Sequence, residues 1–214
     1  LFNEDGSVVV VFNGEIYNHR LLQTELEQLG PRFRSRSDTE SIVRGYQAWG
    51  EGVVERLDGM FAFALWDRAR RRLLLARDRT GKKPLFYAQD GNVLRFGSTI
   101  ASLHASGLPR GIDLSSLPYL LAYGYVPAPR SLHARVGSLE PGQLLLLDEG
   151  QPPILRTYWT PRFTSDFGGR PPESYPLAAR AVRQLVTAAV ERRLESDVPL
   201  GAFLSGGIDS TILV

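Results

Sequence analysis

The sequence predicts an α+β protein, in which a layered domain is followed by the start of a second domain. Apolar residues recur three and four apart within residues 19–57, which is typical of amphipathic helices. Short apolar runs joined by polar turns follow within residues 60–96 and predict antiparallel strands. These strands are apolar on both faces, so we expect a sheet covered on both sides. Helices first and strands after them indicate a layered α+β architecture.

The N-terminal segment combines one predicted strand with three predicted helices. Val8–Phe12 is β-branched and apolar, which predicts a buried strand, and Asn13–Gly14 predicts a turn after it. One helix is expected at His19–Leu29, and a second begins near Ser37–Glu40, where N-cap candidates precede an acidic first turn. A third, short helix is expected near Val53–Leu57. The expected buried faces of the first two helices are Leu22, Leu26 and Leu29, and Ile42, Val43, Tyr46 and Trp49.

The middle of the chain is rich in predicted strands. The expected strands are Met60–Trp66, Arg72–Arg77, Leu85–Ala88, Val93–Phe96 and Gln143–Leu147. Short helices are expected at Ser98–Ser106 and Leu114–Tyr123. We assign the aromatic residues of the first of these strands to the core rather than to a cofactor site: Phe61, Phe63 and Trp66.

A domain boundary is predicted between Asp148 and Leu177. Residues 1–160 are assigned to the first domain, and residues 177–214 to the start of the second. Residues 161–176 are rich in Gly, Pro, Ser and charge, which predicts a linker or surface loop. The second domain is expected to begin with a long helix, Leu177–Ser196, and to continue into a strand at Gly201–Leu204. The expected apolar face of that helix follows Leu177, Ala181, Leu185, Ala188 and Arg192.

Composition argues against several classes of function. The net charge of +2 gives no support to a nucleic-acid or membrane-surface partner. The absence of cysteine excludes disulfides and thiolate metal sites within these residues. There is no apolar run of membrane-spanning length and no signal-peptide pattern, so we expect a cytoplasmic protein. The chain begins at Leu1 and stops inside an incipient helix, which we interpret as a fragment of a longer polypeptide.

The C-terminal run Leu204–Ser210 has the composition of a phosphate-binding loop. Glycines permit a sharp turn and close approach of a ligand, and the following helix adds its positive N-terminal end. Asp209 would repel bare phosphate, so its presence predicts a Mg²⁺ ion between them. The G-x-x-x-x-G-K-[ST] spacing of the P-loop is missing. The run Leu-Ser-Gly-Gly-Ile-Asp-Ser instead resembles the pyrophosphate loop of N-type ATP pyrophosphatases, which cleave ATP between the α and β phosphates. The resemblance implies ATP binding by Leu204, Ser205, Gly206, Gly207, Asp209 and Ser210.

Motifs earlier in the chain resemble a single family. Phe12–Asn18 is similar to the glutamine-pocket motif of class II glutamine amidotransferases, and Ser37–Glu40 is similar to a second motif of that pocket. Other stretches resemble structural signatures of the same domain and the segment that leads to a synthetase domain: Asp58–Phe63, Ala76–Leu85, Tyr125–Pro129 and Leu139–Gly142. In this order and spacing, the chain resembles the glutamine-hydrolysing asparagine synthetases.

The resemblance implies a fold and a reaction. The fold is a four-layer αββα sandwich of the N-terminal-nucleophile glutaminase type without its N-terminal strands, followed by the start of a Rossmann-like ATP pyrophosphatase domain. In such enzymes glutamine is hydrolysed in the first domain, and ammonia passes to the second. There it displaces AMP from an aspartyl adenylate to give asparagine. The implied partners are glutamine, ATP with Mg²⁺, and aspartate, with no organic prosthetic group; a homodimer is a frequent assembly.

Roles for four residues follow from the same resemblance. Attack on the glutamine amide creates a tetrahedral oxyanion, which pre-aimed donors stabilise. The implied donors are the Asn13 side-chain amide and the Gly14 backbone N–H, and glycine at this position would permit close approach of the ligand. Glu15 and Asp38 would hold the α-amino group of glutamine. The plainer reading of Glu15 is a turn former, and that of Asp38 is a helix N-cap.

Other polar residues are given plainer roles. Arg77–Arg79 is expected to form either a buried ion-pair network or an ordinary surface segment. His19, His104 and His133 have no partners at a suitable spacing, so we expect them to be non-catalytic. No arrangement of serine, base and orienting group indicates a serine hydrolase.

The chain also departs from the family's pattern. The family's nucleophile is an N-terminal cysteine, and neither it nor the arginine segment that binds the glutamine carboxylate occurs in these residues. We therefore expect this fragment alone to be inactive. Ser98–Ile100 reads Ser-Thr-Ile, where the family usually has Ser-Glu-Ile. Two alternatives stay open: a β-lactam synthetase-like or other biosynthetic amide ligase without a working glutaminase, and a non-catalytic binding or regulatory protein built on this fold.

Overall fold

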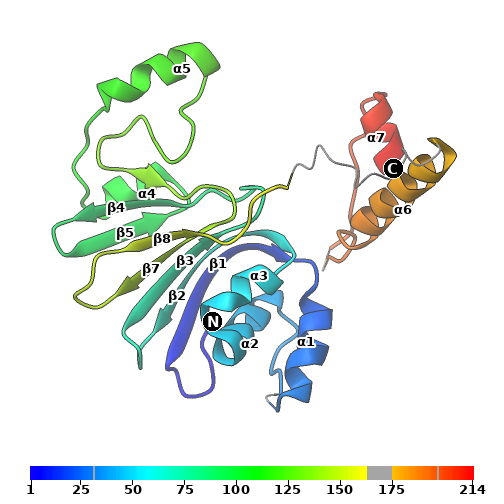
Figure 1. Ribbon diagram of the computed structural model, residues 1–214, viewed down its shortest axis with the longest axis horizontal. Helices are drawn as coiled ribbons and strands as arrows, with labels where there is room; N and C mark the ends of the chain where they lie inside the picture. The colour runs from blue at the N-terminus through cyan, green and yellow to red at the C-terminus, as the bar shows by residue number, and fades with distance from the viewer. Residues whose placement is uncertain (31, 163–174, 197) are drawn as a thin grey trace. The chain divides into compact units, whose positions relative to one another are not determined.

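The computed structural model describes all residues except 31, 163–174 and 197 (Figure 1). Contacts between Cα atoms divide the chain into two compact units, Leu1–Thr160 and Pro161–Val214. Each unit is described by itself.

Two antiparallel sheets form the centre of the first unit (Figure 1). In order across the larger sheet, its strands are β1 (Val8–Ile16), β2 (Gly59–Asp67), β3 (Arg72–Arg77), β7 (Gln143–Asp148) and β8 (Ile154–Thr157). In the same way, the smaller sheet consists of β5 (Val93–Gly97), β4 (Phe86–Asp90) and β6 (Gly137–Ser138). The strands β1, β2 and β3 are consecutive neighbours, whereas β7 joins β3 after a long excursion through the smaller sheet.

Helices cover the outer faces of the two sheets. On the larger sheet they are α1 (His19–Gln28), α2 (Asp38–Trp49), η1 (Gly50–Gly52) and α3 (Val53–Arg56). On the smaller sheet lies α4 (Ile100–Ala105), and η2 (Leu114–Ser116) and α5 (Leu117–Tyr123) follow it along the chain. The order of layers is therefore helix, sheet, sheet, helix, which is the predicted αββα sandwich.

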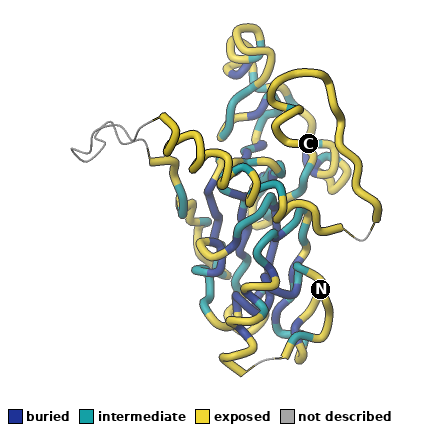
Figure 2. Tube along the Cα trace, turned by 90° about the vertical axis from the view of Figure 1, so that its right-hand side faces the viewer, coloured by how far each residue is buried: buried dark blue, intermediate teal, exposed yellow. Residues whose placement is uncertain are grey.

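The side chains of β2 show why the larger sheet is apolar on both faces. Phe61 and Phe63 point to the helical layer, while Ala62 and Ala64 point to the smaller sheet. All four are buried, and the central strands appear dark blue in Figure 2. Because alternate residues of a strand face opposite sides, a strand between two layers must be apolar throughout. The assignment of Phe61 and Phe63 to the core is confirmed, and Trp66 is half-buried.

Two expectations for the N-terminal segment are wrong. Asn13–Gly14 is not a turn, because β1 continues through it to Ile16 and pairs with β2 along its whole length. A neighbouring strand that offers pairing partners overrides the local turn preference of Asn-Gly. Leu29 is 60% exposed rather than buried, because α1 ends at Gln28 and Leu29 is its C-cap.

The predicted helices are present with shifted bounds. The helix expected at Ser98–Ser106 is α4, and the one expected at Leu114–Tyr123 divides into η2 and α5. The strands β6 and β8 had no counterpart among the predictions. Both are short, and β8 is exposed along its length, so neither has an apolar pattern that distinguishes it from a loop.

The second unit contains two described helices, α6 (Tyr175–Glu191) and α7 (Ile208–Leu213). The long predicted helix thus ends five residues earlier than expected. Gly201–Leu204 is not a strand, because the described part of this unit offers it no strand to pair with. Most of the predicted linker, residues 163–174, lies outside the described residues.

Candidate functional site

The first site element is the contact between Asp38 and the edge of the larger sheet. Asp38 is the first residue of α2, and its Oδ2 accepts a hydrogen bond from the Ile16 backbone N–H at 2.8 Å. The N-cap of α2 is Ser37, whose Oγ accepts from the Thr39 N–H at 3.3 Å. Asp38 is therefore not the cap, and its carboxylate is held against β1, one residue beyond Glu15.

The second element is the outer edge of β1, where hydrogen-bonding groups alternate in direction. Ile16 donates outward to Asp38, while the Tyr17 N–H donates inward to the Asp58 carbonyl at 2.8 Å. In an antiparallel pair this alternation repeats every second residue, so the Gly14 N–H also points outward. Among the described residues, no acceptor is recorded for this N–H. Gly14 thus presents an available backbone donor at the sheet edge.

The neighbouring strand requires a glycine at position 14. A Cβ built at this position would lie 2.1 Å from the Met60 carbonyl oxygen and 2.7 Å from the Phe61 Cα. Opposite residues that share no hydrogen bonds approach most closely, which explains the crowding. Gly59 is in the same situation, because its Cβ would lie 2.2 Å from the Glu15 carbonyl oxygen. The two glycines let β1 and β2 pass closely at the site.

The third element is the Asn13 side chain. Asn13 and Glu15 lie on the face of β1 opposite to Ile16, which packs into the helical layer. The Asn13 Nδ2 donates to the Ser98 Oγ at 3.4 Å. Ser98 follows β5 directly, so the smaller sheet reaches the side chain that carries the expected oxyanion donor. The structure therefore gathers Asn13, Gly14, Glu15 and Asp38 at one end of β1.

Comparison with known proteins shows the family of the chain. Residues 1–159 match the family described as a glutamine amidotransferase domain. The chain belongs to the glutamine amidotransferase family. Residues 181–214, in the second unit, match the family described as asparagine synthase.

Curated relatives match nearly the whole chain. Asparagine synthetase [glutamine-hydrolyzing] 1 of Bacillus subtilis is 36% identical over 211 residues, which are 99% of this chain and 33% of that protein. Asparagine synthetase [glutamine-hydrolyzing] 3 of the same organism is 35% identical over 95% of this chain and 33% of that protein. The chain thus spans about a third of the length of the relatives it matches.

A solved structure supports the fold. Glutamine phosphoribosylpyrophosphate amidotransferase from B. subtilis, complexed with ADP and GMP, aligns with a TM-score of 0.54 and 18% identity. The alignment covers 75% of this chain and 31% of that one. At this identity the likeness concerns the fold alone.

The segment after β3 is tied by hydrogen bonds to the strand that pairs with β1 at the candidate site. The buried Asp78 carboxylate accepts from the backbone N–H groups of Phe61 (3.2 Å), Thr80 (3.0 Å), Lys82 (3.0 Å) and Lys83 (2.9 Å). The Phe61 bond ties this segment to the strand opposite Gly14. The Arg77 guanidinium donates to the carbonyls of Lys83, Gly81 and Leu139, and burial lowers its pKa. No ion pair joins these charges within the described residues. For Arg77 and Asp78, neither the ion-pair network nor the plain surface role is correct, because the two side chains hold a loop by binding its backbone. Arg79 donates to the Glu55 carbonyl at 2.8 Å.

In the second unit, residues 204–210 form a loop that leads into α7. Gly206 has φ of 79°, a conformation that favours glycine, and Gly207 is the N-cap of α7. The hydroxyls of Ser205 and Ser210 are hydrogen-bonded at 3.0 Å, which closes the loop across its base. Asp209 lies exposed in the first turn of α7. The ATP-binding assignment of these residues stays a prediction.

Within the described ranges, no group of three or more His, Cys, Asp or Glu residues could hold a metal ion by itself. No helix in the described parts of the chain is long and apolar enough to cross a membrane.

The sequence did not predict that two of the histidines lie side by side. His104 and His133 were expected to lack partners, yet their rings are hydrogen-bonded at 3.0 Å between Nε2 and Nδ1. They lie 29 positions apart and meet only through the folding of the smaller sheet, so no sequence spacing could have revealed them.

Proposed function

We propose that the chain takes part in glutamine-dependent, ATP-driven amide synthesis, with aspartate as the nitrogen acceptor and asparagine as the product. The observation that carries this proposal is the meeting of the Asn13–Glu15 strand with the Asp38 carboxylate at the edge of β1. The family match of residues 181–214 supports the synthetase half of the reaction. Both halves of the reaction are proposals, because the chain spans about a third of the length of the relatives it matches.

The proposed chemistry of glutamine hydrolysis rests on the charges of two carboxylates and on the directions of two hydrogen-bond donors. The α-ammonium group of glutamine would lie between the carboxylates of Glu15 and Asp38. One oxygen of Asp38 is already occupied by the Ile16 N–H, which fixes the carboxylate and leaves its other oxygen to the ligand and to the Thr39 hydroxyl (3.2 Å). Attack on the side-chain amide would place an oxyanion between the Asn13 Nδ2 and the Gly14 N–H. Removing one such donor from an enzyme typically lowers kcat by about 10²–10³.

The Asn13 amide needs a support if it is to act as a donor. Its Nδ2 carries two hydrogens, and the Ser98 Oγ accepts one of them. Because the amide group is planar, this bond also fixes the direction of the second Nδ2 hydrogen. Ser98 would thus keep the nitrogen, rather than the oxygen, of Asn13 facing the oxyanion.

The ATP half of the proposal concerns the loop before α7. Backbone N–H groups around Gly206 and Gly207, with the hydroxyls of Ser205 and Ser210, would hold the pyrophosphate. A single exposed carboxylate, Asp209, fits Mg²⁺ because this ion is usually held by one or two carboxylates together with substrate phosphates. When bound, Mg²⁺ would neutralise charge on those phosphates. An aspartyl adenylate is the intermediate we expect ammonia to attack.

The product of the complete reading frame allows a direct test. It would be incubated with aspartate, MgATP and glutamine labelled with ¹⁵N in the side-chain amide, and the products would be followed by NMR. We expect labelled asparagine together with AMP. Hydrolysis of ATP without transfer of the label would refute the glutamine-dependent reaction and favour a ligase of the β-lactam synthetase type.

Ligand binding by the product of the complete reading frame separates the glutamine half of the proposal from the ATP half. We expect Asp38→Asn to abolish glutamine binding, measured by calorimetry, and to leave MgATP binding unchanged; Asp209→Asn should do the reverse. A product that binds neither ligand would contradict the assignment and favour a non-catalytic role. Homodimer formation stays a prediction, which sedimentation would test.

A further inference from the structure

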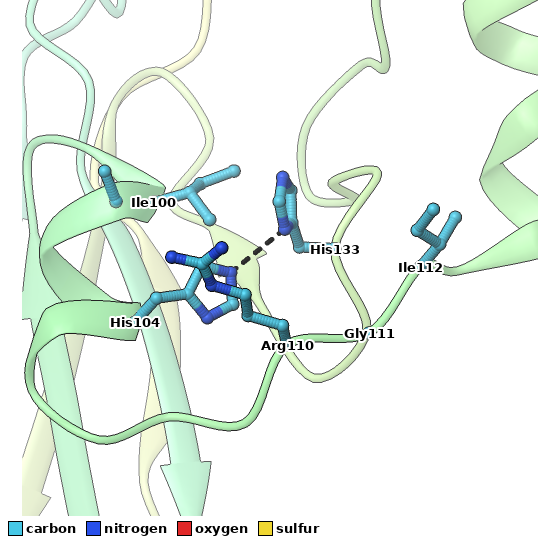
Figure 3. A pocket seen from close by; sticks show the side chains of 7 residues that line it. Ile100, His104, Arg110, Gly111, Ile112 and His133 are labelled. Atoms are coloured by element: carbon cyan, nitrogen blue, oxygen red, sulfur yellow. Dashed lines mark hydrogen bonds between the residues drawn. The ribbon is translucent and has the colours of Figure 1, made fainter.

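An open pocket of about 560 Å³ lies beside α4, outside the amidotransferase site (Figure 3). Its walls come from α4, from the segment 110–112, and from His133. Ile100, Ala101 and Ile112 make the walls largely apolar, and the polar groups are Arg110, His104 and His133. Its combination of apolar walls with a few convergent polar groups is typical of sites for small organic molecules.

Backbone hydrogen bonds hold two walls of the pocket together. Ile112 and His133 form an isolated antiparallel bridge. On either side of it, the Asp113 N–H donates to the Leu132 carbonyl at 2.9 Å, and the Ala134 N–H donates to the Gly111 carbonyl at 3.0 Å. The pocket is therefore built on paired backbone rather than on two independent loops.

The hydrogen bonds of the two histidines determine where a proton can be added. The His104 Nδ1 faces the Leu108 carbonyl at 3.1 Å, and a carbonyl only accepts, so this nitrogen carries a hydrogen. In the neutral pair, the His104 Nε2 accepts from the His133 Nδ1–H, and the His133 Nε2 is left with a lone pair. With one added proton, the His133 Nε2 carries a hydrogen whichever ring holds the charge. Protonation thus converts this atom from an acceptor into a donor without breaking either bond.

Arg110 supplies a permanent positive charge. Its side chain is exposed, reaches across toward His104 in Figure 3, and has no recorded ion pair with any residue that the structure describes. The charged side chains of the neighbouring segments, which do not line the pocket, already have partners. Asp90 lies between Arg95 (3.9 Å) and Arg135 (3.6 Å), and Asp113 accepts from the hydroxyls of Ser115 and Ser116. The Arg95 Nε donates to the Ser106 carbonyl. The uncommitted charge at the pocket is therefore positive.

We propose that this pocket binds a small carboxylate with an apolar body, held by the Arg110 guanidinium and the His133 Nε2–H. A guanidinium matches the planar, two-oxygen geometry of a carboxylate. The apolar part of the ligand would lie against Ile100 and Ile112. A carboxylate bound in this way takes up one proton onto the histidine pair, so binding tightens as the pH falls.

The pocket is connected to the amidotransferase site by one short segment. Ile100 lines the pocket, and Ser98, two residues earlier, accepts the Asn13 hydrogen bond. Thr99 between them is the N-cap of α4, with its Oγ1 accepting from the Ser102 N–H at 3.3 Å. An occupant that shifts α4 would act on the support of Asn13.

The test uses benzoate as the probe and the whole chain. Imidazole NMR signals of His104 and His133 would be followed during titration, and affinities would be measured by calorimetry at pH 6 and pH 8. We expect both histidines to shift, proton uptake on binding, and roughly tenfold tighter binding at pH 6. Signals of both histidines that stay unmoved throughout the titration would overturn the proposal.

Variants and other probes complete the test. Arg110→Gln should weaken benzoate binding by about tenfold or more at both pH values, since it removes a charge-assisted hydrogen bond. His133→Phe should remove the pH dependence, while Arg68→Gln, an exposed arginine in the β2–β3 turn, should change nothing. Asp38→Asn should leave benzoate binding intact, which separates this pocket from the proposed glutamine site. Equal binding of benzylamine or of inorganic phosphate would refute a site for apolar carboxylates.

Discussion

Replacement of Gly14 by alanine tests the close packing of β1 on β2 at the site. The new Cβ would lie 2.1 Å from the Met60 carbonyl oxygen, although real contacts of this kind are not found below 3.0 Å. The strands must therefore separate by close to 1 Å, and the overlap involves backbone atoms that no side-chain rotation relieves. The φ of 156° at Gly14 adds backbone strain.

The expected destabilisation can be compared with a matched control. Overpacking of this kind costs about 1–3 kcal/mol, and unfavourable backbone conformation adds about 1–2 kcal/mol, so Gly14→Ala should lower the free energy of unfolding by about 2–5 kcal/mol. Gly91 also has a positive φ, 57°, but nothing lies within 4 Å of its would-be Cβ. Gly91→Ala should therefore cost only the backbone part, about 1–2 kcal/mol.

Urea unfolding followed by tryptophan fluorescence measures the difference. All three tryptophans, Trp49, Trp66 and Trp159, lie in the first unit, so the signal reports on the amidotransferase fold. With a urea m value of about 2 kcal/mol/M, a loss of 3 kcal/mol moves the midpoint by about 1.5 M. If Gly14→Ala proves no more destabilising than Gly91→Ala, the packing explanation is refuted.

Three further substitutions address the helical layer, each followed by the urea midpoint of unfolding. Burial raises the pKa of Glu40, but hydrogen bonds from Ser35, the Arg34 N–H and Arg44 outweigh it and hold this pKa below the usual 4.5. The stability from these bonds is fully present above about pH 4.5 and is lost as the pH falls through the lowered pKa. Glu40→Gln should therefore lower stability at neutral pH and flatten the loss below pH 4.5; an unchanged acid limb would contradict this. The Tyr46 hydroxyl donates to the buried Asp67 carboxylate at 3.0 Å. Tyr46→Phe should cost about 1–3 kcal/mol, because it leaves a buried acceptor short of a donor, and an unmoved midpoint would show that water replaces the hydroxyl. Ser37→Ala should cost about 1 kcal/mol by removing the N-cap of α2; no loss would mean that Asp38 takes over as the cap.

Periodic apolar patterns predicted most of the fold. The stripe Ile42, Val43 and Tyr46 is buried in α2, and the strands that were apolar on both faces lie between two layers. Both patterns can be read from consecutive residues, although packing between distant segments is what requires them. The strands β6 and β8 have no such apolar pattern, and they were not predicted.

The residues of the site were named from motifs, but their geometry depended on strand pairing. Asn-Gly has a strong local preference for turns, and β2 overrides it by pairing with residues 13 and 14. The outward direction of the Gly14 N–H follows from the hydrogen-bond register of that pair, in which Ile16 donates to Asp38. The register depends on how two strands align with each other, so the sequence of one strand alone does not predict it.

By itself, the sequence predicted a layered α+β domain from its apolar periodicity, and the motifs that carry the family resemblance implied the αββα order and the residues that gather at the end of β1, because periodicity and short motifs are local. Only the tertiary structure decided that Asp38 braces β1 rather than capping its helix, and that Arg77 and Asp78 bind backbone rather than each other. It also decided that His104 meets His133. In each case a polar side chain had several acceptable partners, and the partner it took was the one that chain folding brought within hydrogen-bonding distance.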